Sequence, residues 1–578
     1  MRLKTTALSL GLMILATLLA SAGPASALTS VPDGTTWMAN GFVKASVQYG
    51  NVMFIGGDFS KLGESVFPGP NSGPFVDGYT GLAAIDMTTG QAIANFKPRL
   101  TANANQTLTV FALEMVGNRL FVGGQFSTVN GENHYNLAAL DINPVTFRDT
   151  VVSTFDTVVG IPGNSNEGTF EVRTILAGPD GLYVGGAFSK VDGKGRPKTA
   201  KLEFDGSLVN AYKTAGVDGI VHDMVWAADA QSIFLAGGFK QLGIGNPRYA
   251  LGRIDPTSGA TLPWAVPSSQ IPGATTTGQI CYELATTTTR LFAGCGKKPN
   301  FVGAFRLDAG DVGTRTWQYG TGGNVQTVHL LPNGDDLVIG GHLGINSSQT
   351  YNGLMRVCNN TKYLRAIAIL RNVTSTTSMV SPITTGSTSV TQPYLDCNFL
   401  PNIDGVNPQG PNYSGVNRYG GLWEIQVTDD HLWALGEFRY VNSQVRRSIA
   451  RFSWTGLPPV DPPPPTQPVL TELTTPSPFE VQSDRTLSFT LRCPDQPASC
   501  NGSVKLIAGG SKQFGPVTFA LAPLEDRTFD VILNDGAWDT IQAKSNHQIG
   551  GKLQLTAEGS PDTTPLSSSI SVTLRLAA

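Results

Sequence analysis

A short strand that contains a pair of glycines recurs along the chain and restricts its fold more than any other feature. The clearest copies read FIGGDF, FVGGQF and YVGGAF, and weaker copies read FLAGGF, LFAGC, VIGGH and WALGEF. Their second glycine positions are Gly57, Gly124, Gly186, Gly237, Gly294, Gly341 and Gly436. The intervals suit one small unit each, except the last, which requires an insertion. Units this small cannot bury a hydrophobic face alone, so we expect consecutive units to stack.

Each unit carries four strand-like runs. In the third unit these are EVRTILA, GLYVGGAF, TAKLEFD and SLVNAYK, with Asp-Gly pairs at the turns. We expect the glycine pair to allow close backbone approach and unusual φ angles. The Phe two residues after the second glycine should pack between neighbouring units. An Asp follows the third strand and should cap a turn through its carboxylate. These residues are Asp86, Asp141, Asp205, Asp255 and Asp308.

Seven units of four short strands predict an all-β fold, a seven-bladed β-propeller followed by a small antiparallel β-sandwich. The propeller should span residues 28–455. Its last unit supplies only three strands, so we expect the N-terminal strand GTTWMAN, with Trp37, to complete the seventh blade and close the ring. A segment at about 371–417, rich in Thr, Ser, Asn and Pro, is predicted to be an insertion between blades six and seven. It is either a functional loop or a decorative one.

The C-terminal fifth of the chain is predicted to be a linker and a separate domain. Residues 456–468 hold a run of prolines typical of a stiff linker. Residues 469–578 alternate apolar and polar positions in several runs, which predicts an immunoglobulin-like β-sandwich.

The N-terminus predicts export from the cell. Arg2 and Lys4 precede an apolar stretch, and Ala25-Ser26-Ala27 offers a cleavage site, so residues 1–27 are typical of a signal peptide. We therefore expect a secreted protein, extracellular or associated with the cell surface, without membrane insertion.

The six cysteines fit an oxidising compartment and suggest three local disulfides. The proposed pairs are Cys281 with Cys295, Cys493 with Cys500, and Cys358 with Cys397. No cysteine or histidine spacing indicates zinc, and we expect no metal site.

The repeat strand, the Asn-Gly turn and the Leu-Ala-x-x-Asp strand resemble the repeats of secreted bacterial β-propellers of the delta-60 type, and kelch-type propellers are similar but less close. The resemblance covers roughly residues 30–455 and implies fold and secretion. It implies no common activity, so it transfers no catalytic residues. Units five to seven depart from the pattern, with Gly296 and Leu343 in place of Phe.

Catalytic motifs are missing from the sequence. It contains no GxSxG elbow, HExxH helix, P-loop or EF-hand loop, and we expect no cofactor. Galactose-oxidase-like copper enzymes also combine a propeller with a C-terminal sandwich, and His547 invites that comparison, but no adjacent Tyr-His pair is present. Carboxylates for glycoside cleavage are available on predicted inner strands. They are Glu114, Asp223, Glu283 and Glu424.

One column of the aligned inner strands suggests a recognition surface. It varies between units and contains large polar and aromatic side chains, and a closed ring would gather it near the pore. Its members are Lys44, Phe111, Arg173, His222, Cys281, Gln326 and Trp423. The alternative is that these residues fill gaps between blades. We take all but Cys281 as candidate binding residues.

The expected function is extracellular binding or adhesion, with a glycan or a surface protein as the partner. The alternatives are a secreted polysaccharide hydrolase or lyase with its site at the pore, and a structural cell-surface component. A formal net charge of −3 gives no reason to expect nucleic acid binding. We expect a monomer.

Overall fold

The computed structural model describes residues 27 to 577 with gaps. The undescribed segments are 65–74, 161–169, 344–366, 375–393, 405–420, 456–471, 494–499, 522–525 and 558–565, with scattered positions of one or two residues. The described chain is nearly all β, and its one α-helix is α1 (Asp535–Ala543). No described helix is long and apolar enough to cross a membrane. The predicted signal peptide lies almost entirely outside the described residues.

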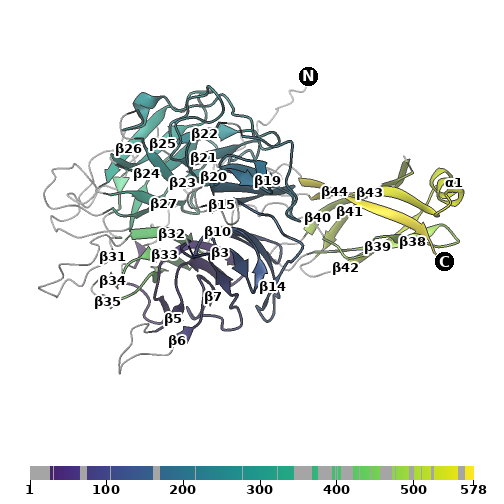
Figure 1. Cartoon of the computed structure of the whole chain (residues 1–578), viewed down its shortest axis with the longest axis horizontal. Helices are drawn as coiled ribbons and strands as arrows, with labels where there is room; N and C mark the ends of the chain where they lie inside the picture. The colour runs from purple at the N-terminus through teal and green to yellow at the C-terminus, as the bar shows by residue number, and fades with distance from the viewer. Residues whose placement is uncertain are drawn as a thin grey trace, which may run out of the picture.

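Seven antiparallel sheets share one strand order in the described part of residues 27–455 (Figure 1). Their innermost strands are β3 (Val43–Tyr49), β9 (Thr109–Val116), β15 (Glu171–Gly178), β20 (Val221–Trp226), β23 (Ile280–Thr286), β27 (Val325–Leu330) and β32 (Gly421–Val427). The second strands are β4 (Val52–Gly57), β10 (Arg119–Gln125), β16 (Gly181–Ala187), β21 (Ile233–Gly237), β24 (Arg290–Gly296), β28 (Leu337–Gly341) and β33 (His431–Glu437). The third strands are β7 (Leu82–Asp86), β13 (Leu137–Ile142), β19 (Thr199–Leu202), β22 (Leu251–Ile254), β25 (Asn300–Arg306), β29 (Ile367–Arg371) and β36 (Ile449–Thr455).

A fourth strand is present in four of these sheets. These strands are β14 (Asp149–Val151), β26 (Arg315–Thr321), β30 (Tyr394–Leu395) and β1 (Ala27–Leu28). In the other three sheets the expected fourth strand is reduced to a single bridge, such as Leu202 to Leu208.

The innermost strands contact one another in a cycle. Each of β3, β9, β15, β20, β23 and β27 packs against the next, and β32 packs against β3. A separate cluster of buried side chains lies between each pair of neighbouring sheets. The expected Phe residues take part: Phe188 lies in the cluster shared by the second and third sheets. Phe59 packs with Trp433 of β33, which joins the first sheet to the last.

The glycine pairs make this packing possible, and their two members have different roles. A Cβ on the first glycine would overlap the next sheet, as Gly123 would overlap Val172. A Cβ on the second glycine would overlap a carbonyl oxygen of its own innermost strand, as Gly186 would overlap the oxygen of Glu171. The glycines are therefore needed chiefly because they let neighbouring backbone and side chains approach closely. Among the second glycines, only Gly341 has a positive φ, so the expectation of unusual φ angles was largely wrong.

The predicted turn caps form in some units only. Asp86 accepts hydrogen bonds from the backbone N–H groups of Thr88 and Thr89, both at 2.9 Å. Asp205 and Asp255 act in the same way.

Two of the five aspartates instead form ion pairs beside their strands. Asp141 pairs with Arg119 at 2.7 Å, and Asp308 pairs with Arg306 at 2.9 Å. The arginine of the same sheet competes for the carboxylate, so the prediction of a turn cap was wrong there.

The strand that pairs with the last sheet also differs from the expected one. Residues Ala27 and Leu28, not the segment around Trp37, pair with β36. Met38 and Ala39 form β2, which pairs with β5 (Lys61–Gly63) of the first unit. Trp37 nevertheless packs in the cluster that the first and last sheets share.

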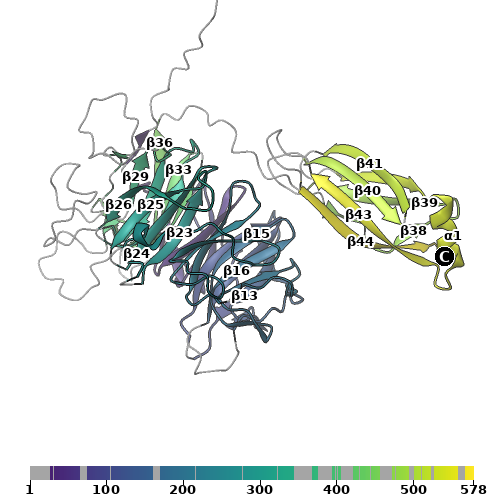
Figure 2. The same cartoon turned by 90° about the horizontal axis from the view of Figure 1, so that it is seen from above.

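The C-terminal strands form two sheets around one further core cluster. One sheet has the order β37 (Glu472–Leu473), β39 (Thr486–Arg492), β42 (Asp526–Ile532). The other has the order β38 (Phe479–Val481), β44 (Leu566–Leu576), β43 (Gln548–Ala557), β40 (Cys500–Ala508), β41 (Ser511–Leu521). Figure 2 shows most of these strands as a group apart from the seven sheets. The pairing of β38 with β44 is parallel, contrary to the expected antiparallel pattern.

Two of the three predicted disulfides are present. Cys281 bonds to Cys295 across β23 and β24, and Cys493 bonds to Cys500. The predicted pair Cys358–Cys397 lies outside the described residues, as does most of the predicted 371–417 insertion.

The glycine geometry predicts an effect on stability. Gly186→Ala should lower the free energy of unfolding by about 1–3 kcal/mol, because the new Cβ must displace the backbone of β15. Gly195→Ala is the matched control, since a Cβ there meets no atom within 4 Å, and its effect should stay within about 0.5 kcal/mol. Urea unfolding of both variants measures the difference. Equal stability of the two would contradict this role for the glycine pair.

Candidate functional site

Every innermost strand contains a β-bulge at the same place. In β3, for example, Val43 pairs with Gly57 and Ala45 with Gly56, so Lys44 is an extra residue without an opposite partner. A bulge turns the side chain of its extra residue to a new direction. The seven extra residues are Lys44, Phe111, Arg173, His222, Tyr282, Gln326 and Trp423.

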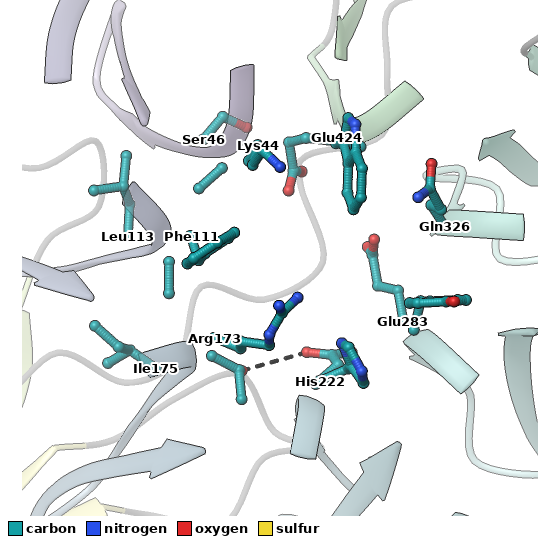
Figure 3. A pocket seen from close by; sticks show the side chains of 16 residues that line it. Lys44, Ser46, Phe111, Leu113, Arg173, Ile175, His222, Glu283, Gln326 and Glu424 are labelled. Carbon is teal, nitrogen blue, oxygen red and sulfur yellow. Dashed lines mark hydrogen bonds between the residues drawn. The ribbon is translucent and has the colours of Figure 1, made fainter. Parts of the chain in front are cut away.

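All seven bulge residues line one cavity of about 190 Å³ where the innermost strands meet (Figure 3). Gln326 is buried, and the other six are partly exposed. The next residue along each strand differs around the ring. It is small on the first three strands, at Ala45, Ala112 and Thr174. It is a carboxylic acid on three of the remaining four, at Asp223, Glu283 and Glu424.

The structure thus brings together Lys44, Phe111, Arg173, His222, Gln326 and Trp423, the six residues selected from the sequence. The fifth member of the aligned column was wrong. Cys281 pairs with Cys295, and the bulge residue is Tyr282.

The error has a physical cause in the fifth unit. Gly294 takes the role of the first glycine, next to Val325, and Cys295 takes the place of the second. The alignment is therefore displaced by one residue. The predicted disulfide between directly opposed positions was the signal that would have corrected it, because it fixes the register of β23 against β24.

Two cations and two aromatic rings form one side of the cavity. The Lys44 ammonium lies 4.2 Å from the centre of the Trp423 ring and 5.3 Å from that of Phe111. The Arg173 guanidinium lies 4.7 Å from the centre of the same Phe111 ring. Such contacts hold a cation by the negative face of the ring. Burial lowers the pKa of Lys44, chiefly because the ammonium loses water.

The imidazole of His222 is held neutral. Its ring packs edge-on against Tyr282 with the centres 5.1 Å apart. Burial, and secondarily the nearby Arg173 charge, lower the pKa of His222 to about 3. It therefore contributes no positive charge at neutral pH.

Burial raises the pKa of each of the three carboxyl groups at the cavity, enough to keep Glu283 and Glu424 protonated at neutral pH but not Asp223. Burial raises the pKa of Asp223 to about 6, although its carboxylate accepts hydrogen bonds from the N–H groups of Met224 and Leu284 at 2.8 Å. Burial and then the charge of Asp223 raise the pKa of Glu424 to about 8. Burial and then the charges of Glu424 and Asp223 raise the pKa of Glu283 well above its usual range.

Glu114, the fourth carboxylate selected from the sequence, lies on the innermost strand β9, but it does not line this cavity. Burial alone raises its pKa to about 8.

Two buried side-chain polar atoms of the cavity lining have no hydrogen-bond partner among the described residues. They are Oε1 of Gln326, whose residue is 5% exposed, and Nε1 of Trp423. Unpaired buried polar atoms are costly, so such atoms point to a ligand or water. They provide one acceptor on β27 and one donor on β32, the strand that also carries Glu424.

Among the described residues no group of three or more His, Cys, Asp or Glu side chains could hold a metal ion. His547, the residue that invited the copper comparison, precedes β43 and does not line the cavity. The cavity therefore offers hydrogen bonds, aromatic surface and two cations.

Comparison with known proteins places part of the chain in a fold type. Residues 178–208 match a family described as "Domain of unknown function (DUF5122) beta-propeller", which supports a β-propeller type for this nearly all-β chain. No curated protein matches the chain.

Two solved structures resemble it weakly. The computationally designed protein Ika8 is 9% identical, with a TM-score of 0.36, and the match covers 72% of this chain and 98% of that one. A fungal alcohol oxidase in complex with copper is 12% identical, with a TM-score of 0.35, and the match covers 95% of this chain and 99% of that one. Similarity at this level carries no argument about this chain.

The buried carboxyl groups predict a pH dependence of stability. The pKa of Glu424 is about 8 in the folded protein and 4.5 ordinarily, so the folded state binds more protons between these values. Stability should therefore fall as pH rises from about 4.5 to about 8. Glu424→Gln keeps a neutral side chain and should raise the melting temperature at pH 9, by several degrees relative to its effect at pH 5.

Thermal unfolding followed by circular dichroism across this pH range measures the effect. Glu132→Gln, at an exposed position on β12 (Glu132–Asn133), is the control and should leave the pH profile unchanged. Parallel profiles for Glu424→Gln and the unmodified protein would show that Glu424 is not held neutral.

Proposed function

We propose that the chain is a secreted binding protein that recognises an extracellular glycan at the centre of a seven-bladed β-propeller. The observation that carries the proposal is the convergence of seven bulge residues, one from each innermost strand, on a single cavity. Side chains that served only to fill gaps between blades would be apolar. These include two cations, an amide and three aromatic rings, with unpaired polar atoms among them.

The cyclic contacts of the innermost strands support seven blades for residues 28–455. The two sheets and shared core of the C-terminal strands support an immunoglobulin-like sandwich for residues 469–578, with residues 456–468 as the linker. Two formed disulfides are consistent with an oxidising compartment, and thus with the proposed signal peptide at residues 1–27.

A glycan is favoured over a surface protein by the shape and chemistry of the cavity. Its lining is concave and confined to the ring, whereas protein partners usually need a larger, flatter surface. Amide, indole N–H and neutral carboxyl groups can donate to and accept from sugar hydroxyls.

A second candidate is a polysaccharide-active enzyme. Glu283 and Glu424 line the same cavity, and burial raises the pKa of both, helped at Glu283 by the charge of Glu424 and at Glu424 by the charge of Asp223. A carboxyl group that stays protonated near neutral pH is suited to act as a general acid. The two residues are the candidates for that role.

The proposal predicts binding without turnover. Purified protein lacking residues 1–27 should be retained by a member of a panel of immobilised polysaccharides, and no reducing or unsaturated ends should appear. Trp423→Ala should weaken retention about tenfold or more, because it removes ring surface and the free indole N–H from the cavity.

The matched control is Trp538→Ala, a tryptophan that packs against the C-terminal core. It should leave retention unchanged. Full retention by a folded Trp423→Ala variant would contradict the site. Release of product that Glu283→Gln abolishes would establish the enzyme instead.

A further inference from the structure

Of the two cations at the cavity, Lys44 lacks a paired carboxylate among the described residues, whereas Arg173 is paired with Glu171 through Nε alone. None of the described carboxylates forms an ion pair with the Lys44 ammonium, which instead lies against the rings of Trp423 and Phe111. The acidic groups that act on it, Asp58 first among them, do so at a distance. A partly dehydrated ammonium without a paired anion is costly unless a bound anion completes it.

Arg173 is oriented but not fully paired. Its Nε donates to Oε1 of Glu171 at 2.6 Å, and Glu171 is itself buried. No described residue accepts a hydrogen bond from its two terminal nitrogens, and Figure 3 shows the guanidinium pointing into the cavity. A guanidinium held at Nε presents its terminal nitrogens as a fork, which suits a carboxylate.

Lys44 and Arg173 act on the same space. Both lie against the Phe111 ring, and the charge of Arg173 helps burial to lower the pKa of Lys44. The residues next along these strands are small, at Ala45 and Thr174, so the cations border open volume instead of packed side chains.

The rest of the cavity lining is rich in hydrogen-bonding groups. Asp223 has a pKa of about 6 and is charged at neutral pH, but its carboxylate is already held by the N–H groups of Met224 and Leu284. Glu283 and Glu424 are kept protonated by burial, so they do not repel an anion, and each can donate as well as accept. The free Oε1 of Gln326 adds an acceptor. The site therefore combines two cations with groups that match hydroxyls.

We propose that the cavity binds an acidic sugar of the uronic acid class, with the sugar carboxylate between Lys44 and Arg173 and its hydroxyls facing Glu283, Glu424 and Gln326. This inference rests on the proposed glycan-binding function and specifies its ligand. The volume of about 190 Å³ admits more than a single inorganic anion. The divided lining distinguishes such a ligand from a neutral sugar.

Isothermal titration calorimetry tests the inference on the full protein lacking residues 1–27. The ligands are D-galacturonate and D-glucuronate, their methyl esters, and D-galactose and D-glucose. At least one acid should bind, and its ester and the neutral sugar should bind at least tenfold more weakly. This comparison needs no variant. Equal affinity of acid and ester, or no binding of either acid, would overturn the inference.

A lysine variant locates the anion. Lys44→Met should weaken binding of the acid at least tenfold, while Lys190→Met, at an exposed position on β17 (Lys190–Val191), should not change it. Unchanged affinity in a folded Lys44→Met protein would overturn the assignment. Tighter binding of trigalacturonate than of galacturonate would identify a polymer as the source, and equal binding would identify a free sugar acid. Both results support the acidic class.

The two proposals fail in different ways. If neutral polysaccharides are retained and Trp423→Ala abolishes that retention, the glycan site stands and only the acidic ligand is wrong. If the unmodified protein is retained by no polysaccharide and binds no sugar, the proposed function itself is wrong.

Discussion

In six of the seven repeats the fold depends on the contact between the second glycine and a carbonyl oxygen at the start of the neighbouring inner strand, and in the fifth repeat Cys295 stands at that position. At Gly186 this oxygen belongs to Glu171, two residues before the bulge residue Arg173. The missing Cβ lets the two strands approach closely enough for one residue of the inner strand to be expelled from the pairing. The first glycine, such as Gly123, then admits Val172 of the next sheet. One pair of glycines thus sets both the register within a sheet and the spacing between sheets.

The same contact determines the chemistry at the centre. A glycine on the adjacent strand accommodates the bulge. The side chain of the extra residue is therefore not needed for strand pairing. Equivalent positions therefore hold residues as different as Lys44, Phe111 and Gln326. The positive charges are those of Lys44 and Arg173, whereas the carboxyl groups with raised pKa values come from other strands of the ring. If all three carboxyl groups were charged, they would repel one another across a poorly hydrated space, so protons remain bound.

The repeat made much of the fold predictable, and the failures have local causes. The glycine periodicity predicted the positions of the innermost strands. It therefore also predicted that Arg173 and Trp423 lie near the pore, and both line the cavity. It misplaced Tyr282, because Cys295 replaces a glycine in the fifth unit. Strand propensity pointed to Trp37 as the residue closing the last sheet, but β1 is too short and too near the predicted cleavage site for periodicity to detect. Helix α1 was also missed, although Asn534, whose side chain accepts from the Ala537 N–H, is a typical N-cap.

What the sequence could not supply is the protonation of the site. Glu283 and Glu424 are far apart along the chain, and only the cycle of inner strands brings them to one cavity, where burial and neighbouring carboxylates raise the pKa of both. A pattern of residues reports which groups are present, whereas their charge depends on burial and on neighbours from other repeats. Reading the four carboxylates as charged from the sequence suggests a negative pore. With Glu283 and Glu424 neutral, Lys44 and Arg173 are the cations that line the cavity, and the pore is positive on the side that they occupy.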